Sequence, residues 1–189
     1  MTVFENYLQL HFDISPDDCK ILSGSFKQET IRKGDYFLRS GSPSDRLSFI
    51  QAGMLRIYVK LQDKEVTQWV STPGAFVTDF NAFFHQQPSL RDIQALADTE
   101  LLTIDYGQFK ALRQSMPPWT AFERVFIGKC FVFMENRVFD LISLSAEERY
   151  QRLFQQNPEL LNQVPLQYLA SMLGMTPETF SRIRKKLST

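Results

Sequence analysis

Seven short runs containing β-branched and aromatic residues lie between residues 26 and 104, and their spacing constrains the fold more than any other feature. The runs are FKQETI, DYFLR, RLSFI, MLRIYVKL, EVTQWV, IQAL and ELLTI. Most of them are separated by segments rich in turn-forming residues, namely KGD, SGSPSD, QAG, QDK and TPG. Short strands at regular intervals are typical of antiparallel all-β architectures. We therefore predict a small antiparallel β-roll or jelly-roll, in which MLRIYVKL and EVTQWV form a hairpin.

Helical segments are expected before and within this roll. A short amphipathic helix is predicted at the start of the chain, and a second turn of helix around SPDDCKIL. Residues 74–89 interrupt the strand pattern, because AFVTDFNAFFHQQP is apolar but lacks the alternation of a strand. We expect a turn of helix inserted in the roll here, and we take this segment as the candidate ligand pocket.

A helical period dominates from Pro118 to about Ile142, which corresponds to a helix of roughly 35 Å. Its main apolar stripe contains Trp119, Phe122, Phe126, Cys130, Phe133 and Arg137, with Val125, Val132 and Phe139 beside it. A helix that is apolar on more than one side needs cover on both sides. We favour a two-fold dimer seam, because it would present the following segment as a symmetric pair. An intramolecular core helix is the alternative.

The stretch from Leu166 to Leu187 has the pattern of two helices joined by a tight turn. Leu169, Ala170 and Leu173 lie at helical spacing before Gly174, and the period resumes afterwards at Phe180, Ile183 and Leu187. Ala170 allows close approach of the helices, and Gly174 suits the positive φ that ends the first one. Met175 fills the corner, Thr176 caps the second helix, and Pro177 fits its first position. This combination predicts a helix-turn-helix.

The outward face of the second helix is basic, as a surface that binds double-stranded DNA needs to be. Within residues 176–189, Arg182, Arg184, Lys185 and Lys186 are opposed by Glu178 alone. Arginine can bond guanine in the major groove, and glutamate can accept from cytosine. We predict that Glu178 and Arg182 contact base edges, while Thr176, Thr179, Ser181, Arg184, Lys185 and Lys186 contact mainly the backbone. The alternatives are a merely solvated charged face and a protein-interaction surface.

Ser145 and Glu148 form a capping-box pattern that predicts a new helix after Leu144. A hinge is therefore expected at 142–145. The predicted organisation is a β-roll sensor domain at 1–116, a dimerisation helix and hinge at 117–144, and a helix-turn-helix domain at 145–189. The fold class is α+β.

Composition argues against several other classes of protein. Lys plus Arg and Asp plus Glu both number 21, so any attraction to a polyanion must be local. Cys19 and Cys130 lack metal-ligand spacing, so we expect packing residues and no iron–sulfur cluster. The two histidines lie far apart in sequence, and no nucleophile, P-loop or metal-site motif occurs, so we expect neither an enzyme nor a metal site. With neither a signal sequence nor an apolar span in view, we expect a cytoplasmic protein that does not enter the membrane.

Nearly the whole chain resembles the Crp/Fnr superfamily of bacterial transcription regulators. The strongest matches are IRKGDYFLRSGSPSDRLSFIQAGMLRIYV at 31–59 and TPETFSR at 176–182, where the family commonly has Ser-Arg-Glu-Thr-Val-x-Arg. The resemblance implies a cyclic-nucleotide-binding-like roll, a dimerisation helix and DNA reading by Glu178 and Arg182. Pro177 replaces the family's common arginine, so we expect a different preferred operator. The sequence has two residues after Leu187, so a full carboxyl-terminal β-hairpin wing is not expected.

The candidate effector pocket departs from the family pattern. Nucleotide-binding relatives have glycine and glutamate for the ribose where this chain has Thr78 and Asp79, and arginine followed by serine or threonine for the cyclic phosphate where it has Ser89 and Leu90. Arg91 is displaced by two positions. A missing arginine contact would cost roughly 1.5–3 kcal/mol. The effector is therefore unknown: the candidates are a cyclic nucleotide, another small ligand and no ligand, and Asp79 and Arg91 could be a simple ion pair. The predicted pocket residues are Thr78, Asp79, Phe80, Ser89, Leu90 and Arg91.

The resulting prediction is a homodimeric DNA-binding transcriptional regulator. Its expected partners are double-stranded DNA and a second copy of the chain, with RNA polymerase as a candidate. The alternative is a ligand-binding module whose helix-turn-helix serves protein interaction.

Overall fold

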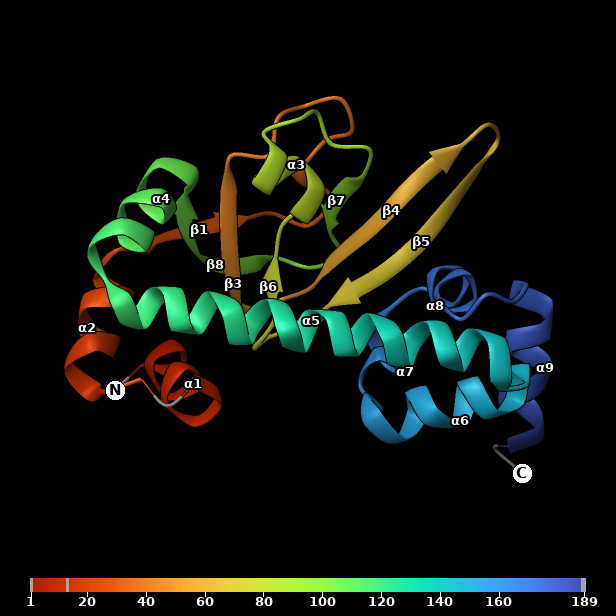
Figure 1. Ribbon diagram of the computed structural model, residues 1–189. Coiled ribbons are helices and arrows are strands. Elements are labelled where there is room, and N and C mark those ends of the chain that lie inside the picture. The colour runs from red at the N-terminus through yellow and green to blue at the C-terminus, as the bar shows by residue number, and fades with distance from the viewer. Residues whose placement is uncertain (1, 13, 188–189) are drawn as a thin grey trace. The chain divides into compact units, whose positions relative to one another are not determined.

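The structure, a computed structural model, describes residues 2–12 and 14–187, which form an α+β arrangement (Figure 1). The helices are α1 (Val3–Phe12), α2 (Pro16–Gly24), α3 (Phe80–His85), α4 (Tyr106–Ser115), α5 (Pro117–Ser143), α6 (Ala146–Gln156), α7 (Leu160–Gln163), α8 (Leu166–Met172) and α9 (Pro177–Leu187). The strands are β1 (Lys27–Ile31), β2 (Tyr36–Leu38), β3 (Arg46–Ala52), β4 (Leu55–Leu61), β5 (Lys64–Ser71), β6 (Phe76–Val77), β7 (Asp92–Ala95) and β8 (Thr99–Asp105).

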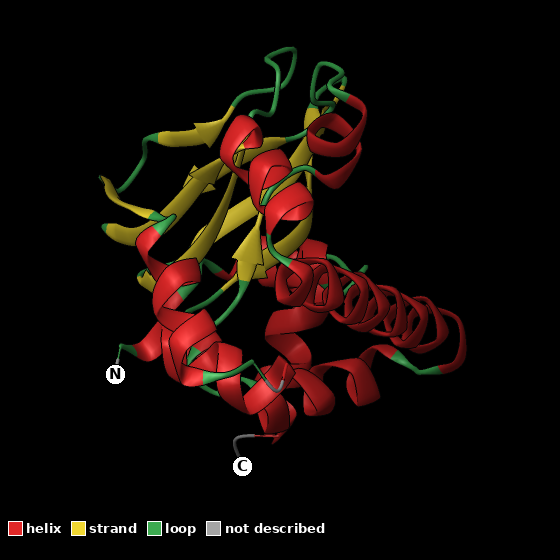
Figure 2. Cartoon of the chain, turned by 60° about the vertical axis from the view of Figure 1, so that its left-hand side comes forward, coloured by secondary structure: helices red, strands yellow, loops and turns green. Residues whose placement is uncertain are grey.

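The strands form two four-stranded sheets with the orders β1-β8-β3-β6 and β2-β7-β4-β5 (Figure 2). The pairings of β1 with β8 and of β3 with β8 are antiparallel, with Ile31 opposite Thr99 and Ile50 opposite Leu101. Buried side chains from both sheets share one cluster: Ile31, Phe37, Leu38, Ile50, Leu55, Val77, Ile93, Ala95 and Leu101. The predicted antiparallel roll is confirmed, and its core lies between the two sheets.

Each of the seven predicted runs contains a strand, and the predicted β4–β5 hairpin and the inserted helix α3 are confirmed. Three elements were not predicted: the four-residue helix α7, the strand β6 and the helix α4. β6 has only two residues and pairs with β3. The helix α4 begins after Asp105, whose carboxylate accepts from the Gln108 N–H at 2.8 Å. That N-cap is a sequence signal that could have located α4.

Compact packing divides the chain into two units. The first contains Met1–Ile57 and Val70–Lys129, and the second contains Tyr58–Trp69 and Cys130–Thr189. These units differ from the predicted domains in two respects. The boundary falls within α5, and the outer part of the β4–β5 hairpin belongs to the carboxyl-terminal unit.

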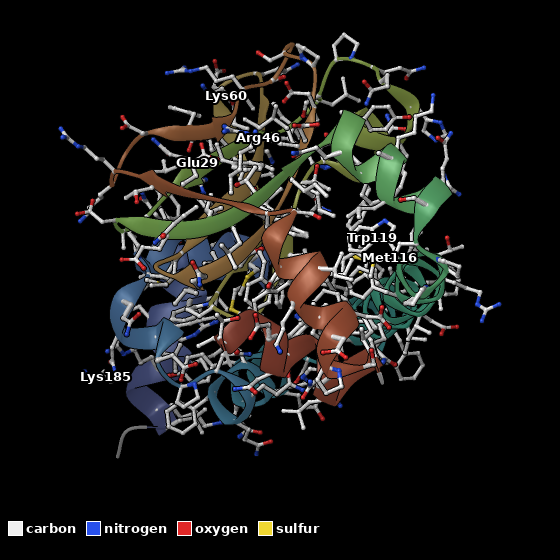
Figure 3. All side chains as sticks on the ribbon, turned by 90° about the vertical axis from the view of Figure 1, so that its left-hand side faces the viewer. Glu29, Arg46, Lys60, Met116, Trp119 and Lys185 are labelled. Carbon is white, nitrogen blue, oxygen red and sulfur yellow. The ribbon has the colours of Figure 1, made fainter. Side chains whose placement is uncertain are left out.

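The part of α5 in the first unit requires a correction to the dimer-seam prediction. Trp119, Phe122 and Phe126 are 0%, 2% and 8% exposed. Their rings pack against aromatic rings of the same unit: Phe122 lies 4.4 Å from Phe12, and Phe126 lies 5.0 Å from Phe76, between ring centroids. Met116 and Trp119 lie together in this interior (Figure 3). These three predicted seam residues are therefore covered by their own chain, as the intramolecular alternative proposed.

Among residues 2–12 and 14–187, no helix has the length and hydropathy to cross a membrane. The same described residues contain no group of three His, Cys, Asp or Glu side chains that could hold a metal ion.

Candidate functional site

The helices α8 and α9 form the predicted helix-turn-helix, within the second unit. Gly174 has φ of 66° at the turn, and the Met175 N–H donates to the Ala170 carbonyl at 3.0 Å. This is the left-handed helix end that favours glycine. Ala170 is fully buried, as expected for a small residue where two helices approach. The turn geometry predicted from the sequence is confirmed.

The amino-terminal end of α9 is capped as predicted. The Thr179 N–H donates to Thr176 Oγ1 at 3.2 Å, and Pro177 is the first helical residue. The pKa of the exposed Glu178 is lowered, first by its own backbone N–H and then by the Thr176 hydroxyl. A negative charge also interacts favourably with the helix amino terminus. Glu178 is therefore ionised at neutral pH and can act as a hydrogen-bond acceptor only.

The inner face of α9 is apolar and packed. Phe180 is fully buried and its ring lies 5.1 Å from that of Tyr150 on α6, in an edge-to-face arrangement. Ile183 is 7% exposed. Leu187, which was predicted to face inward, is 40% exposed, because the helix ends there and no described element covers it. The apolar side of α9 is thus shorter by one turn than the sequence suggested.

The outer face of α9 carries most of the predicted DNA-binding side chains. Thr176, Glu178, Ser181, Arg182, Arg184, Lys185 and Lys186 are exposed, and Thr179 is half-buried. The capping box at Ser145 is present, and it places Glu147 in the first turn of α6. Lys186 Nζ pairs with the Glu147 carboxylate at 2.7 Å, so its charge partly serves to tie α9 to α6. Exposed and buried side chains of α9 therefore follow the helical period. Contact of the exposed side chains with DNA remains a prediction.

The carboxyl-terminal part of α5 exposes a row of large apolar side chains in the same unit. Those most exposed are Phe131 at 68%, Phe139 at 66% and Ile142 at 80%, with Val132 and Val138 at about half. Of the predicted seam residues in this part, Cys130 is half-buried, Phe133 packs on Trp69 at 4.9 Å, and Arg137 is hydrogen-bonded within the chain. Phe133 is nevertheless 45% exposed, so the exposed apolar face includes this stripe residue together with the residues that flank the stripe.

The predicted effector segment holds a buried carboxylate whose acceptor sites are occupied. Asp79 accepts from Ser89 Oγ at 2.7 Å and from Arg91 Nη1 at 3.1 Å, and it caps α3 through the N–H groups of Asn81 and Ala82. Burial acts to raise the pKa of Asp79, but the Ser89 hydroxyl and the Arg91 guanidinium outweigh it, so the pKa is lowered. Asp79 and Arg91 form an ion pair, as the simplest interpretation of the sequence proposed.

The rest of the segment is tied to the loop between β2 and β3. Backbone bonds join Gly41 to the Ser89 carbonyl at 2.7 Å and Ser89 to the Ser42 carbonyl at 2.8 Å. The Thr78 and Ser44 hydroxyls lie 3.1 Å apart. Phe80 and Leu90 are exposed at 38% and 69%. The structure therefore brings Thr78, Asp79, Ser89 and Arg91 together as a closed polar cluster and leaves Phe80 and Leu90 at its surface.

A hollow of about 440 Å³ lies in the first unit, and sequence reasoning missed it. Its lining residues are Tyr36, Phe37, Leu38, Arg39, Ser42, Pro43, Ser44, Asp45 and Arg46. Arg46 is held by Glu29 at 2.5 Å and by the Phe37 carbonyl at 2.5 Å (Figure 3). Arg39 lies over the Tyr36 ring at 3.8 Å. The serine-rich turn SGSPSD at 40–45 was the only sequence signal for this region.

The architecture is similar to that of known proteins. Residues 28–116 match the family model of the cyclic nucleotide-binding domain. No curated protein sequence matches the chain. Among solved structures, the c-di-GMP-responsive global regulator CLP of Xanthomonas campestris is 19% identical over 92% of both chains, with a TM-score of 0.71. FixK2 of Bradyrhizobium japonicum is 18% identical, with a TM-score of 0.72 over 86% of this chain and 84% of its own.

A third similar structure is a transcriptional regulator assigned to the Crp/Fnr family from Eubacterium rectale. It is 17% identical and has a TM-score of 0.70 over 97% of this chain and 88% of its own. At these identities the likeness establishes the fold. The α+β fold predicted from the sequence, with its cyclic nucleotide-binding-type roll, long helix and carboxyl-terminal helices, is confirmed.

Proposed function

We propose that this chain, which shares the fold of Crp/Fnr-type transcription regulators, is itself a homodimeric DNA-binding regulator and not an enzyme. The observation that carries the proposal is the two-sided character of α9. Phe180 and Ile183 anchor it inward, while Arg182, Arg184 and Lys185 are exposed on the outer side. A helix with an anchored apolar side and an exposed basic side suits insertion in a major groove.

Base reading is assigned to Glu178 and Arg182. Arg182 lies one helical turn after Glu178, so both side chains project from the same exposed face of α9. The ionised Glu178 can accept from a cytosine amino group, and Arg182 can donate two bonds to a guanine. Pro177 has no donor to offer at the position where the related regulators commonly have arginine, so we expect the operator to differ at that base.

Dimerisation is assigned to the exposed apolar row on α5. Phe131, Phe139 and Ile142 form a water-exposed apolar surface that a second copy would cover by two-fold symmetry. Two recognition helices would then address half-sites about 34 Å apart. RNA polymerase remains a candidate partner of the bound dimer.

We assign the sensing of the signal to the roll, and we leave the chemical class of the effector open. Asp79 and Arg91 already satisfy each other, so a cyclic phosphate would have to displace Arg91 from an established ion pair. This disfavours the cyclic mononucleotide mode and directs a ligand screen toward other classes. The c-di-GMP responsiveness reported for CLP makes a cyclic dinucleotide one compound worth including.

The test begins with selection of bound sequences from random duplex DNA. Fluorescence anisotropy with the selected operator should then show binding that weakens steeply as salt is raised. Arg182→Ala should weaken operator binding roughly 5- to 150-fold, because one bidentate base contact is worth ~1–3 kcal/mol. Arg32→Ala, which removes an exposed arginine from a turn of the roll, is the matched control.

Two outcomes would reject the proposal. The first is the absence of any duplex that the wild-type protein selects. The second is an equal affinity of the Arg182→Ala variant and the wild type for the selected operator. Sedimentation of the free protein as a monomer at the concentration of the binding assay would reject the dimer.

A further inference from the structure

Arg137 in α5 joins three segments of the second unit. Its Nη2 atom donates to the Gln68 carbonyl in β5 at 2.7 Å and to the Met172 carbonyl in α8 at 2.7 Å. Its guanidinium also lies over the Trp69 ring, 4.8 Å from the ring centroid. One side chain therefore binds the outer part of the β4–β5 hairpin and the first helix of the helix-turn-helix at once.

The site is partly withdrawn from water. Burial lowers the pKa of Arg137, and the charge of nearby Asp140 acts in the opposite direction. Removing a guanidinium from water is unfavourable unless its donors find acceptors. The two carbonyls and the aromatic face supply these interactions, so the arginine has a fixed geometry that a mobile surface arginine lacks.

A second bond joins the same two elements independently of Arg137. The Thr67 N–H donates to Ser171 Oγ at 2.9 Å, and Thr67 is 2% exposed. The hairpin is thus attached to α8 at two adjacent points. We call this set of residues the hairpin clasp: Thr67, Gln68, Trp69, Arg137, Ser171 and Met172.

The clasp acts on the end of α8 that precedes the turn. Met172 is the last residue of α8, so its carbonyl has no partner within the helix, and a cation there also interacts favourably with the negative end of the helix dipole. Gly174 and the buried Ala170 join α8 closely to α9. Fixing the end of α8 therefore fixes the start of α9, which begins three residues after Gly174.

We propose that Arg137 is a positioning residue for the recognition helix: through the hairpin clasp it holds α8, and with it α9, against the β4–β5 hairpin and α5 in the orientation that binds DNA. β4, β5 and α5 all run continuously from the first unit into this unit, so the clasp joins segments that lead back to the roll. This inference rests on the proposed DNA-binding function.

The clasp positions the recognition helix and does not mask it. Arg182 and Ser181 are exposed while the clasp is closed, and no clasp residue belongs to α9. Opening the clasp would therefore free the helix pair without uncovering new readers. The expected result of its loss is weaker DNA binding. Without the clasp, the entropic cost of ordering α8 and α9 falls on the association with DNA.

The experiment compares Arg137→Gln with Arg124→Gln, which removes an exposed arginine from the same helix. The first readout needs no DNA: hydrogen exchange of the Thr67 amide, measured by NMR or on peptides spanning 64–71. Exchange should accelerate about tenfold or more in Arg137→Gln, the equivalent of 1.4 kcal/mol of local opening, and should not change in Arg124→Gln. Ser171→Ala, a milder change, should accelerate the same amide.

The second readout is operator affinity as a function of salt. Arg137→Gln should bind about tenfold more weakly, with the slope of affinity against salt unchanged, because Arg137 contacts no phosphate. A reduced slope would instead show that Arg137 contacts DNA and would overturn the proposal. So would an unchanged affinity in a variant whose Thr67 amide exchanges faster.

The two readouts separate this inference from the proposed function. If the wild type selects no operator, DNA binding fails, yet Thr67 exchange still reports whether the clasp exists. If the wild type binds its operator and neither Arg137→Gln nor Ser171→Ala changes Thr67 exchange, the clasp is wrong and the DNA-binding proposal stands. If Arg137→Gln does not fold, the milder Arg137→Lys, which keeps the charge but lacks the guanidinium fork, replaces it in both readouts.

Discussion

Replacing Asp79 tests whether the segment that resembles a nucleotide pocket is a structural cluster. The carboxylate is 3% exposed, and it caps α3 through the Asn81 and Ala82 N–H groups. It also accepts from Ser89 and Arg91 at 2.7 and 3.1 Å. Asp79→Asn keeps a side-chain oxygen that can cap the helix, but it removes the charge that Arg91 faces. Asp79→Ala removes both.

The magnitudes follow from these contacts. A hydrogen bond to a charged group contributes about 1.5–3 kcal/mol, and the lower half of that range applies because one third of the Arg91 side chain is exposed to solvent. Asp79→Asn should therefore lower the free energy of unfolding by about 1.5–2 kcal/mol at pH 7. Asp79→Ala also loses the N-cap, which adds about 1 kcal/mol.

The difference between wild type and Asp79→Asn should depend on pH in one direction. The pKa of Asp79 is lowered in the folded protein, so the unfolded chain takes up the proton first as pH falls. The contribution is therefore fully present above the ordinary pKa of aspartate, about 4, and is lost as pH falls through the folded-state pKa. The two unfolding curves should converge at the acid end.

Urea unfolding followed by far-ultraviolet circular dichroism between pH 3 and 7 measures both effects. Asp63→Asn, which neutralises an exposed carboxylate in the β4–β5 turn, is the matched control and should change stability little. An Asp79→Asn variant as stable as the wild type at pH 7 would show that the ion pair contributes nothing. A variant that is more stable and binds a ligand more tightly would show that the cluster is a functional pocket.

Three further changes have definite expectations. Gly53→Ala should destabilise the roll severely and reduce soluble expression, because φ is +86° and the added Cβ would lie 2.4 Å from the Asp98 carbonyl oxygen. Phe180→Ala should cost about 3–5 kcal/mol in urea unfolding and abolish operator binding, since the ring is fully buried against Tyr150; a loss below about 1 kcal/mol would show that α9 is not anchored there. Phe139→Glu, at a 66% exposed position, should shift the sedimenting species from dimer to monomer while leaving the circular dichroism spectrum unchanged; a persisting dimer would move the interface elsewhere.

Local sequence signals were sufficient for most of the elements. The alternating runs located seven strands, and the serine cap at Ser145 located the start of α6. Gly174 and Ala170 were enough to predict the turn of the helix-turn-helix, because positive φ and close helix approach admit few other residues. The same reasoning overlooked α4, whose N-cap Asp105 ends a strand and was absorbed into it.

Which surface a side chain meets was decided only by the tertiary structure. Helical periodicity placed Trp119 and Arg137 on one stripe, but periodicity says which residues share a face and not what covers that face. The fold covers Trp119 with the aromatic core and sets Arg137 against two carbonyls that lie 69 and 35 residues away along the chain. Likewise Asp79 and Arg91 were visible as a pair, yet only the folded loops show that Ser89 completes the cluster. Local propensity is encoded within a few residues, whereas partners distant in the chain are chosen by packing, and that is why the elements could be predicted and the hairpin clasp could not.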